Sequence, residues 1–411
     1  MAKKFKGGMH GRDVIYHFKN PAMDFFFQWV LGMSANGGST VGECFSAASK
    51  ITEGDTLSWA RNWDKLGSDV QKRAENSLKN NQTVSARESF LRAYTYYRAS
   101  VLFLSPFEDS KYKEYLSKAR NCFQQALLLF DIPVTSFEIP YNGSVLPGYF
   151  FKPDDSGAKR KTLIMIGGGD TFVEDLYFYI VPSGIKRDYN VLIVDLPGQG
   201  SLPYEGLPWI PETEIPMAKV VDYLLGQQGV DEDKIAAMGI SGGGYLVPRA
   251  ATKEKRIKAI CASSIILSFE KHWTELTKIP KLAKIEDTWV FSLLKSIKRK
   301  SFGVASGLID TYKWRWGVKS MKELIDVSKP MYYEPSDITC PTLILIGESE
   351  YNLDWSRHCA EVSIEQISNE RKEVIITPLA EGAEGHAIGT NISLMSQLVF
   401  DWFDETLKLK K

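Results

Sequence analysis

Hydrophobic residues in the first third of the chain recur at three- and four-residue steps, the spacing of one helix face. The pattern predicts amphipathic helices over residues 55–81, 85–104 and 111–130. Asp55 is a favoured N-cap for the first helix, and Ser85 followed by Glu88 has the spacing of a capping box for the second. Because no 34-residue repeat connects these helices, they predict a small all-helical domain over residues 1–133 rather than a tetratricopeptide array.

The hydrophobic period changes near Pro133. Residues 135–153 have the pattern of a β-hairpin with Asn142 and Gly143 at its turn. Short, nearly continuous apolar runs follow, separated by helical stretches: KTLIMIGGG, YNVLIVDLPGQG, KIAAMGIS, KAICASSII, PTLILIGES and KEVIITPL. Such runs are typical of strands buried on both faces, so residues 134–411 are predicted to form an α/β domain with a mostly parallel sheet flanked by helices.

Between about residues 268 and 335 the strand pattern gives way to a helical stretch rich in tryptophan. Ligands bind at the carboxyl ends of the strands in open α/β sheets. We therefore expect this insertion to form a helical cap over those ends. His272 and Trp273 lie in it and are candidates for contact with a substrate.

Composition restricts the kind of partner. Lysine and arginine together number 50, as do aspartate and glutamate, so the charge favours neither nucleic acid nor an anionic membrane surface. No run reaches the roughly 18 apolar residues that a membrane helix needs, and the N-terminus shows no apolar signal segment. The five scattered cysteines argue against a disulfide framework or a zinc site and indicate a reducing, cytoplasmic location. We expect no metal and no cofactor.

The segment GISGGGY contains Ser241, follows a predicted strand and leads directly into a predicted helix. Gly-x-Ser-x-Gly in this context is typical of a nucleophile elbow, a sharp turn whose glycines leave the serine hydroxyl exposed above the sheet. A serine hydroxyl needs a base to remove its proton. His386 lies in a glycine-rich loop after the last predicted strand, where the chain order of nucleophile, acid and base places the histidine. Ser241 and His386 are therefore predicted as nucleophile and base.

The acid is expected on the loop after the seventh strand, in the segment GESEYNLD. Glu350 stands three residues after the glycine, which is a common hydrolase spacing. Asp354 offers the more usual residue type, and Glu348 is a third choice. The sequence favours Glu350 and leaves Asp354 open as the alternative acid.

Acyl chemistry also needs hydrogen-bond donors for the charge that develops on the carbonyl oxygen. One is expected to be the amide N–H of Gly242, directly after the nucleophile. The other is expected from the loop after the third strand, in IGGGDTFVED, where Gly169 or Asp170 can supply it.

In chain order, the segments GGGDT, VDLPGQG, GISGGGY and GHA, behind a helical domain with SARESFLRAYTYYRA, resemble one group of α/β-hydrolases. These are the acylaminoacyl-peptidase-like or dipeptidyl-aminopeptidase-like enzymes, whose relatives include dihydroxypseudooxynicotine hydrolase. The resemblance spans about residues 20–407. It implies an α/β-hydrolase fold, Ser241 as nucleophile, His386 as base, and a site closed by the helical domain and the cap. It also implies a homodimer, and members of the group cleave carbon–carbon bonds next to a carbonyl as well.

We therefore expect a serine hydrolase that cleaves an ester, amide or ketone C–C bond of a small acyl substrate through an acyl-enzyme-type intermediate. The same triad would serve an acyltransferase or cyclase, or an aminopeptidase-like peptidase, and these alternatives stay open. A non-catalytic scaffold with this fold is disfavoured, because it would have no reason to keep both Ser241 and His386.

Overall fold

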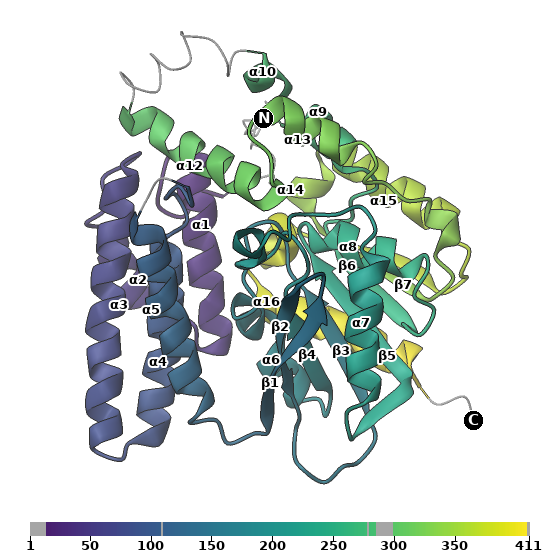
Figure 1. The fold of residues 1–411 in the computed structure, drawn as a ribbon, viewed down its shortest axis with the longest axis horizontal. Coiled ribbons are helices and arrows are strands. Elements are labelled where there is room, and N and C mark those ends of the chain that lie inside the picture. The colour runs from purple at the N-terminus through teal and green to yellow at the C-terminus, as the bar shows by residue number, and fades with distance from the viewer. Residues whose placement is uncertain (1–13, 108–109, 278, 285–298, 409–411) are drawn as a thin grey trace. The chain divides into compact units, whose positions relative to one another are not determined.

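The chain folds into two compact units (Figure 1). The computed structural model describes residues 14–107, 110–277, 279–284 and 299–408. The helical unit comprises the described parts of Val14–Asp131 and Lys281–Trp314, and the sheet unit comprises the described parts of Ile132–Pro280 and Arg315–Lys411. The predicted cap is thus divided, because its middle groups with the helices and its two ends group with the sheet. Residues 285–298 of that cap lie outside the described residues.

The helical unit is built on long amphipathic helices. Its helices within Val14–Asp131 are α1 (Pro21–Gly32), α2 (Val41–Ala48), α3 (Thr56–Lys79), α4 (Thr83–Ser100) and α5 (Ser110–Leu127). Asp55 caps α3 as expected, accepting a hydrogen bond from the Ser58 amide at 2.9 Å. The predicted capping box at Ser85 is wrong, because α4 already begins at Thr83. Asn81, in the left-handed region with φ of 59°, closes a turn so tight that one residue, the N-cap Gln82, separates it from the start of α4.

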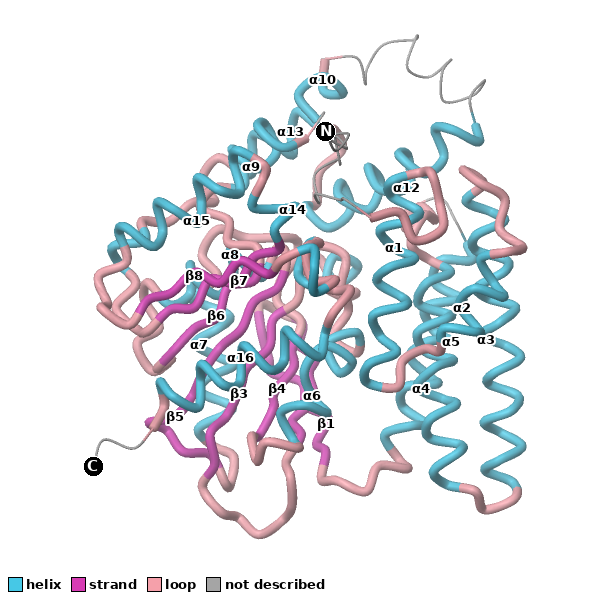
Figure 2. Tube along the Cα trace, turned by 180° about the vertical axis from the view of Figure 1, so that it is seen from behind, coloured by secondary structure: helices cyan, strands magenta, loops and turns pink. Residues whose placement is uncertain are grey.

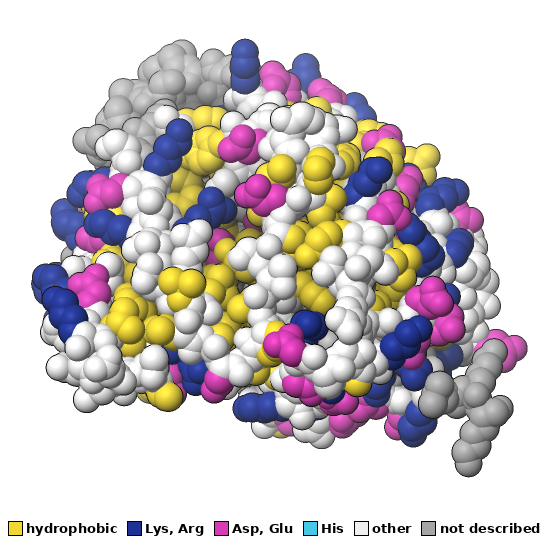
Figure 3. Space-filling view, turned by 60° about the horizontal axis from the view of Figure 1, so that its bottom comes forward, with side chains coloured by type: hydrophobic (Ala, Val, Ile, Leu, Met, Phe, Trp, Pro, Cys, Tyr) yellow, Lys and Arg dark blue, Asp and Glu magenta, His cyan; other side chains and the backbone are white. Residues whose placement is uncertain are grey.

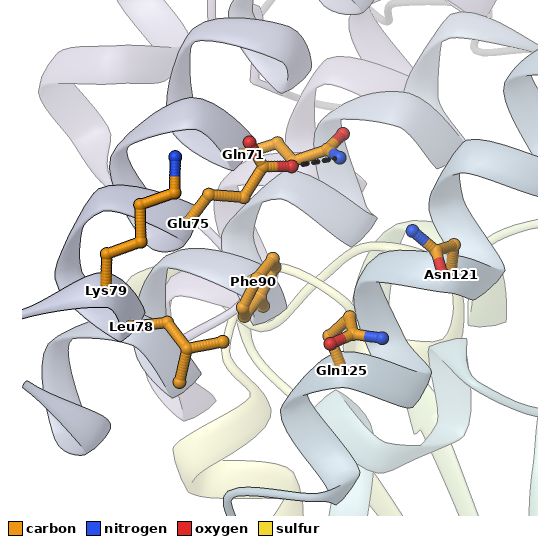
Figure 4. Close-up of a pocket in the computed structure, with 7 residues that line it drawn as sticks. All are labelled: Gln71, Glu75, Leu78, Lys79, Phe90, Asn121 and Gln125. Atoms are coloured by element: carbon orange, nitrogen blue, oxygen red, sulfur yellow. Dashed lines mark hydrogen bonds between the residues drawn. The ribbon is translucent and has the colours of Figure 1, made fainter. Parts of the chain in front are cut away.

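Helix α4 lies between α3 and α5 and is buried over most of its surface. On α3 the rings of Trp59 and Trp63 are fully buried, and Trp63 stacks on Tyr96 of α4 with ring centroids 5.8 Å apart. A hollow of about 300 Å³ opens between these helices (Figure 4). It is lined by Gln71, Glu75, Leu78, Lys79, Phe90, Asn121 and Gln125. None of the predicted site residues lines it, so we assign it no role in catalysis.

In the described part of the sheet unit, eight strands form one sheet in the order β1-β2-β4-β3-β5-β6-β7-β8. They are β1 (Val134–Tyr141), β2 (Ser144–Phe151), β3 (Arg160–Ile166), β4 (Asn190–Val194), β5 (Val230–Ile240), β6 (Ala259–Ser263), β7 (Thr342–Gly347) and β8 (Lys372–Thr377). Strand β2 pairs antiparallel with both β1 and β4, and the remaining pairs are parallel. The predicted hairpin is confirmed, with Asn142 and Gly143 both at positive φ between β1 and β2.

Helices cover both faces of this sheet, which explains why its central strands are continuously apolar. The principal helices are α6 (Asp175–Ile185), α7 (Glu214–Leu225), α8 (Gly243–Ala251), α15 (Asp354–Gln366) and α16 (Ile392–Thr406). Helices α6 and α16 lie together on one face, while α7 and α8 cover the other (Figures 1 and 2). Shorter helices follow β6 and β7: α9 (Phe269–Leu276), α10 (Ile279–Ala283), α13 (Met321–Ser328) and α14 (Glu348–Tyr351). Helix α12 (Arg299–Trp316) crosses the division between the two units.

The distribution of charged side chains on the surface agrees with the equal numbers of basic and acidic residues in the sequence. On the face that Figure 3 shows, basic and acidic side chains are interspersed, with hydrophobic side chains between them. Within the part of the chain that the structure describes, no helix is long and apolar enough to cross a membrane.

Candidate active site

Ser241 sits on the sharp turn between β5 and α8, with a φ of 55°. The turn requires glycine on both sides of it. A Cβ on Gly239 would lie 2.0 Å from the Gly243 carbonyl oxygen, and a Cβ on Gly243 would lie 2.6 Å from the carbonyl oxygen of Ile166 in β3. Backbone packing at these distances leaves no room for a side chain, so the Gly-x-Ser-x-Gly pattern is a steric requirement of this elbow.

His386 reaches Ser241 from the loop after β8. Its Nε2 lies 2.9 Å from Ser241 Oγ, and its Nδ1 lies 3.0 Å from Oε1 of Glu350. Glu350 belongs to the short helix α14, which starts directly after β7. The two loops are tied together by their backbones, because the Ser349 amide donates a hydrogen bond to the Glu384 carbonyl at 3.0 Å. The structure therefore brings together the nucleophile, base and acid candidates that the sequence favoured.

The alternative acid, Asp354, lies elsewhere. Its side chain is 96% exposed at the start of α15 and forms a salt bridge with Arg357 at 2.6 Å. Glu348 accepts a hydrogen bond from the amide of Leu379 at an exposed position. Among the described residues, Glu350 is the one of the three candidates whose carboxylate lies within hydrogen-bond distance of His386, and its side chain is just 6% exposed.

Burial and charge act in opposite directions on this pair. Burial alone would raise the pKa of the Glu350 carboxyl, but the charge and hydrogen bond of His386 and the hydrogen bond of Ser264 hold that pKa below its ordinary value. Burial alone would lower the pKa of His386, but the carboxylates of Glu350 and Asp170 raise it above the ordinary value. The result is an ionised acid beside an imidazole that is well suited to accept a proton.

The proposed oxyanion donors lie next to the nucleophile. A Cβ on Gly168 would lie 2.8 Å from Ser241 Oγ and 3.0 Å from the Gly242 nitrogen, and a Cβ on Gly242 would lie 3.1 Å from the Gly169 nitrogen. The amides of Gly242 and Gly169 are thus neighbours. The side-chain amide of buried Gln199 donates hydrogen bonds to the carbonyl oxygens of Gly167 at 2.6 Å and Gly168 at 3.3 Å. These bonds fix the orientation of the loop after β3.

Asp170 follows these glycines, and its carboxylate contributes to the raised pKa of His386. The carboxylate of Asp170 therefore favours the protonated form of His386, while the sequence had suggested only its backbone amide as an oxyanion donor.

An aromatic cluster lies beside the nucleophile. Trp209 stacks on Trp316 with centroids 5.4 Å apart, and its ring edge would be 2.7 Å from a Cβ on Gly242. Phe269 contacts both tryptophans edge-on, at 5.1 Å, and Trp273 joins the cluster against Phe269. The sequence singled out Trp273 but missed Trp209, which follows β4 in a proline-rich loop without a recognisable signal.

His272 packs edge-on against Phe269 and Trp273. Burial, followed by the charge of His386, lowers the pKa of His272 to about 4, although the charge of Glu350 acts in the opposite direction. His272 is therefore neutral at pH 7 and close enough to the triad candidates to respond to their charge.

Backbone strain is concentrated around the site. Among the described residues, the non-glycine residues with positive φ are Asn81, Asn142, Asp188, Ser241, Ser264, Ala387 and Ile388. Asparagine and aspartate tolerate this region, whereas the last four residues do not, and all four lie in the loops that carry or support the candidate triad. Such positions cost about 1–3 kcal/mol each and persist only where their surroundings fix them.

Sequence reasoning also missed Ser264, whose hydroxyl contacts both Glu350 and His386. The available signal was its place, since Ser264 directly follows the buried strand β6 at the end of the sheet where ligands bind. Within the described residues, no group of three or more His, Cys, Asp or Glu side chains could hold a metal ion.

Comparisons with known proteins identify the family of the chain. The family Esterase FrsA-like matches residues 52–289, more than half of the chain. The α/β hydrolase xenA of Xenoacremonium sinensis is 31% identical over 94% of this chain and 97% of its own length. The 20-hydroxy-prefusarin hydrolase FUS2 of Gibberella moniliformis is 28% identical over 95% of this chain and 98% of its own length.

Solved structures give the same fold. The crystal structure of 2,6-dihydroxy-pseudo-oxynicotine hydrolase superposes with a TM-score of 0.70 at 18% identity, covering 92% of this chain and 95% of that one. AbyA5 follows with a TM-score of 0.62 at 14% identity, covering 94% and 98%. With its elbow, its eight-stranded sheet and these full-length relatives, the chain belongs to the FrsA-like esterase family and is an enzyme with the α/β-hydrolase fold.

Proposed function

We propose that the protein is a serine hydrolase in which Ser241, His386 and Glu350 act as nucleophile, base and acid. One observation carries the proposal: His386 bridges the other two residues, with Nε2 2.9 Å from Ser241 Oγ and Nδ1 3.0 Å from Glu350 Oε1. These are hydrogen-bond distances at which a base can remove the serine proton while a carboxylate orients and stabilises the imidazole.

In this mechanism Ser241 Oγ attacks the carbonyl carbon of an acyl substrate as His386 Nε2 takes the hydroxyl proton. The amides of Gly242 and Gly169 stabilise the oxyanion, and the proton then passes from His386 to the leaving group. Water, activated by the same imidazole, releases the acyl group and restores Ser241. The bond that is cleaved is an ester, an amide or a C–C bond next to a ketone, because each of these forms a tetrahedral intermediate at the same carbon.

The substrate is proposed to be a small organic molecule. The relative FUS2 is named as a 20-hydroxy-prefusarin hydrolase, and its match extends over 95% of this chain, so we expect a substrate of comparable kind. The aromatic cluster of Trp209, Phe269 and Trp316 beside the nucleophile supports an apolar group on that substrate.

Covalent labelling tests the proposal. A fluorophosphonate is incubated with the protein, and the intact mass is measured for wild type, Ser241→Ala, His386→Ala and, as a matched control, Ser46→Ala on the exposed surface of α2. We expect one adduct on wild type and on Ser46→Ala, and none on Ser241→Ala or His386→Ala. Labelling of a folded Ser241→Ala protein would contradict the proposal. So would a folded wild type that reacts neither with this probe nor with the smaller diisopropyl fluorophosphate.

A further inference from the structure

Ser264 lies directly after β6 and is only 2% exposed. Its Oγ is 2.7 Å from Oε2 of Glu350 and 3.2 Å from Nδ1 of His386. Glu350 Oε1 is occupied by the same imidazole nitrogen at 3.0 Å. The serine hydroxyl, the carboxylate and the ring nitrogen thus form a closed triangle, in which each oxygen of Glu350 has its own donor.

The backbone of Ser264 is held in an unfavourable conformation to make these contacts. Its φ is 67°, a region that serine rarely adopts. On one side its amide donates a hydrogen bond to the Leu345 carbonyl of β7 at 3.1 Å. On the other side its carbonyl packs against α8, where a Cβ on Gly244 would lie 2.3 Å from the Ser264 oxygen. A residue that is held in a strained conformation by contacts with two elements, here β7 and α8, is typical of a functional site.

We propose that Ser264 is a positioning residue of the triad, which holds the Glu350 carboxylate and the His386 ring in register for proton transfer from Ser241. This inference rests on the proposed serine hydrolase function. The chemical reason is that Glu350 is buried, and a buried carboxylate oxygen without a donor is costly. The Ser264 hydroxyl donates to Oε2, which leaves its own lone pair directed to the Nδ1–H of His386. The two contacts together favour the tautomer whose Nε2 is free to accept the Ser241 proton.

The same contacts make a prediction about the protonation of His386. A hydroxyl donor stabilises the Glu350 carboxylate most when no imidazolium compensates its charge, so the 2.7 Å contact of Ser264 favours neutral His386 and outweighs the longer 3.2 Å contact to Nδ1, which acts in the opposite direction. Among the described residues, the titratable groups facing this pair include Asp170, from the loop after β3, His272, from α9, and Cys359, from α15. All three remain in place when Ser264 is changed. Removing the hydroxyl should therefore raise the pKa of His386 and move the acid limb of the reaction toward higher pH.

The test uses the rate of fluorophosphonate labelling of Ser241 in the full chain, measured from pH 5 to 9. Ser264→Ala removes the hydroxyl and keeps the strained backbone. Ser264→Gly removes the hydroxyl and relieves the strain, and Ser264→Cys keeps a weak donor of similar size. We expect Ser264→Ala and Ser264→Gly to react about 10- to 100-fold more slowly than wild type, the loss typical of a hydrogen bond to a charged group. Ser264→Cys should lie between them and wild type, and in Ser264→Ala the pH midpoint should rise by roughly half a unit.

A double-mutant cycle separates positioning from a general effect on folding. If Ser264 acts through Glu350, then Ser264→Ala in a Glu350→Gln background should slow labelling by no more than about twofold. Three results would each overturn the inference: Ser264→Ala within twofold of wild type at an unchanged midpoint, recovery of the wild-type rate in Ser264→Gly, or the full penalty of Ser264→Ala in the Glu350→Gln background. A folded wild type that is labelled neither by the fluorophosphonate nor by diisopropyl fluorophosphate would instead refute the proposed hydrolase function and this inference with it.

Discussion

Replacing Glu350 by glutamine gives the sharpest prediction, because the side chain keeps its shape while it loses its charge and exchanges one acceptor oxygen for an NH2 group. The side chains of Glu350 and His386 are 6% and 7% exposed, so solvent screens their interaction weakly. With Nδ1 and Oε1 3.0 Å apart, the charge centres are about 4 Å apart, and an effective dielectric constant of about 20 gives about 4 kcal/mol. If the transition state contains an imidazolium, the loss of this interaction should slow labelling of Ser241 about 1000-fold.

The pH dependence of the remaining activity has a defined sign. Labelling requires neutral His386, so its rate rises with pH through the pKa of that residue. In wild type burial lowers this pKa, but the charge and hydrogen bond of Glu350 together with the charge of Asp170 outweigh burial and place it above its ordinary value. In Glu350→Gln the burial dominates, so the pKa falls and the midpoint of the acid limb moves to lower pH. This direction is opposite to that expected for Ser264→Ala.

The assay is the second-order rate of fluorophosphonate labelling, followed by intact mass across the same pH range. Asp354→Asn is the matched control, since it also removes one carboxylate charge but at a side chain that is 96% exposed. We expect it to react within about twofold of wild type. A slow Asp354→Asn beside a near-normal Glu350→Gln would refute the reasoning and move the acid role to Asp354.

Further outcomes follow from packing and burial. Gly168→Ala places a Cβ 2.5 Å from Ser241 Cβ, so labelling should fall at least about 100-fold while circular dichroism stays unchanged; near-normal labelling would contradict the described approach of the two loops. Asp55→Ala removes the N-cap of α3 and should destabilise the helical unit by about 1 kcal/mol in urea unfolding, without changing the rate at Ser241. Four of the five cysteines are buried, and Cys340 is partly exposed. Titration with Ellman's reagent at pH 8 should therefore detect fewer than two reactive thiols in the native protein and five in guanidinium chloride.

Sequence patterns were sufficient for the elements whose form depends on nearby residues. The six apolar runs all became strands, and the Asn142-Gly143 turn formed because its residues accept positive φ. Ser241 was identifiable because the elbow places steric demands on its immediate neighbours. His386 was identifiable from its order in the chain, once the fold class was recognised. The capping box at Ser85 failed because the tight turn at Asn81, rather than a preferred residue type, determines where α4 begins.

The identity of the acid was decided by tertiary structure. Glu350 and Asp354 stand four residues apart on the same loop, and both have a carboxylate of suitable chemistry. Helix α14 turns Glu350 toward His386, whereas Asp354 starts α15 and points to solvent. Local pattern cannot distinguish these directions, because they depend on how the loop after β7 packs against the loop after β8.

Ser264 shows the same limit of local sequence pattern, because nothing near it in the chain indicates its partners. It lies 86 residues from Glu350 and 122 from His386 along the chain, and no motif connects them. They meet because β6, β7 and β8 are neighbours in the sheet, so that the segments after their carboxyl ends converge. The sequence by itself determined the fold class and two members of the candidate triad, since periodicity and turn sterics are local properties and the chain order of nucleophile and base follows from the fold class. Only the tertiary structure decided which acid and which supporting serine stand beside the base, because the direction of α14 and the order of β6, β7 and β8 bring together segments that are distant in the chain.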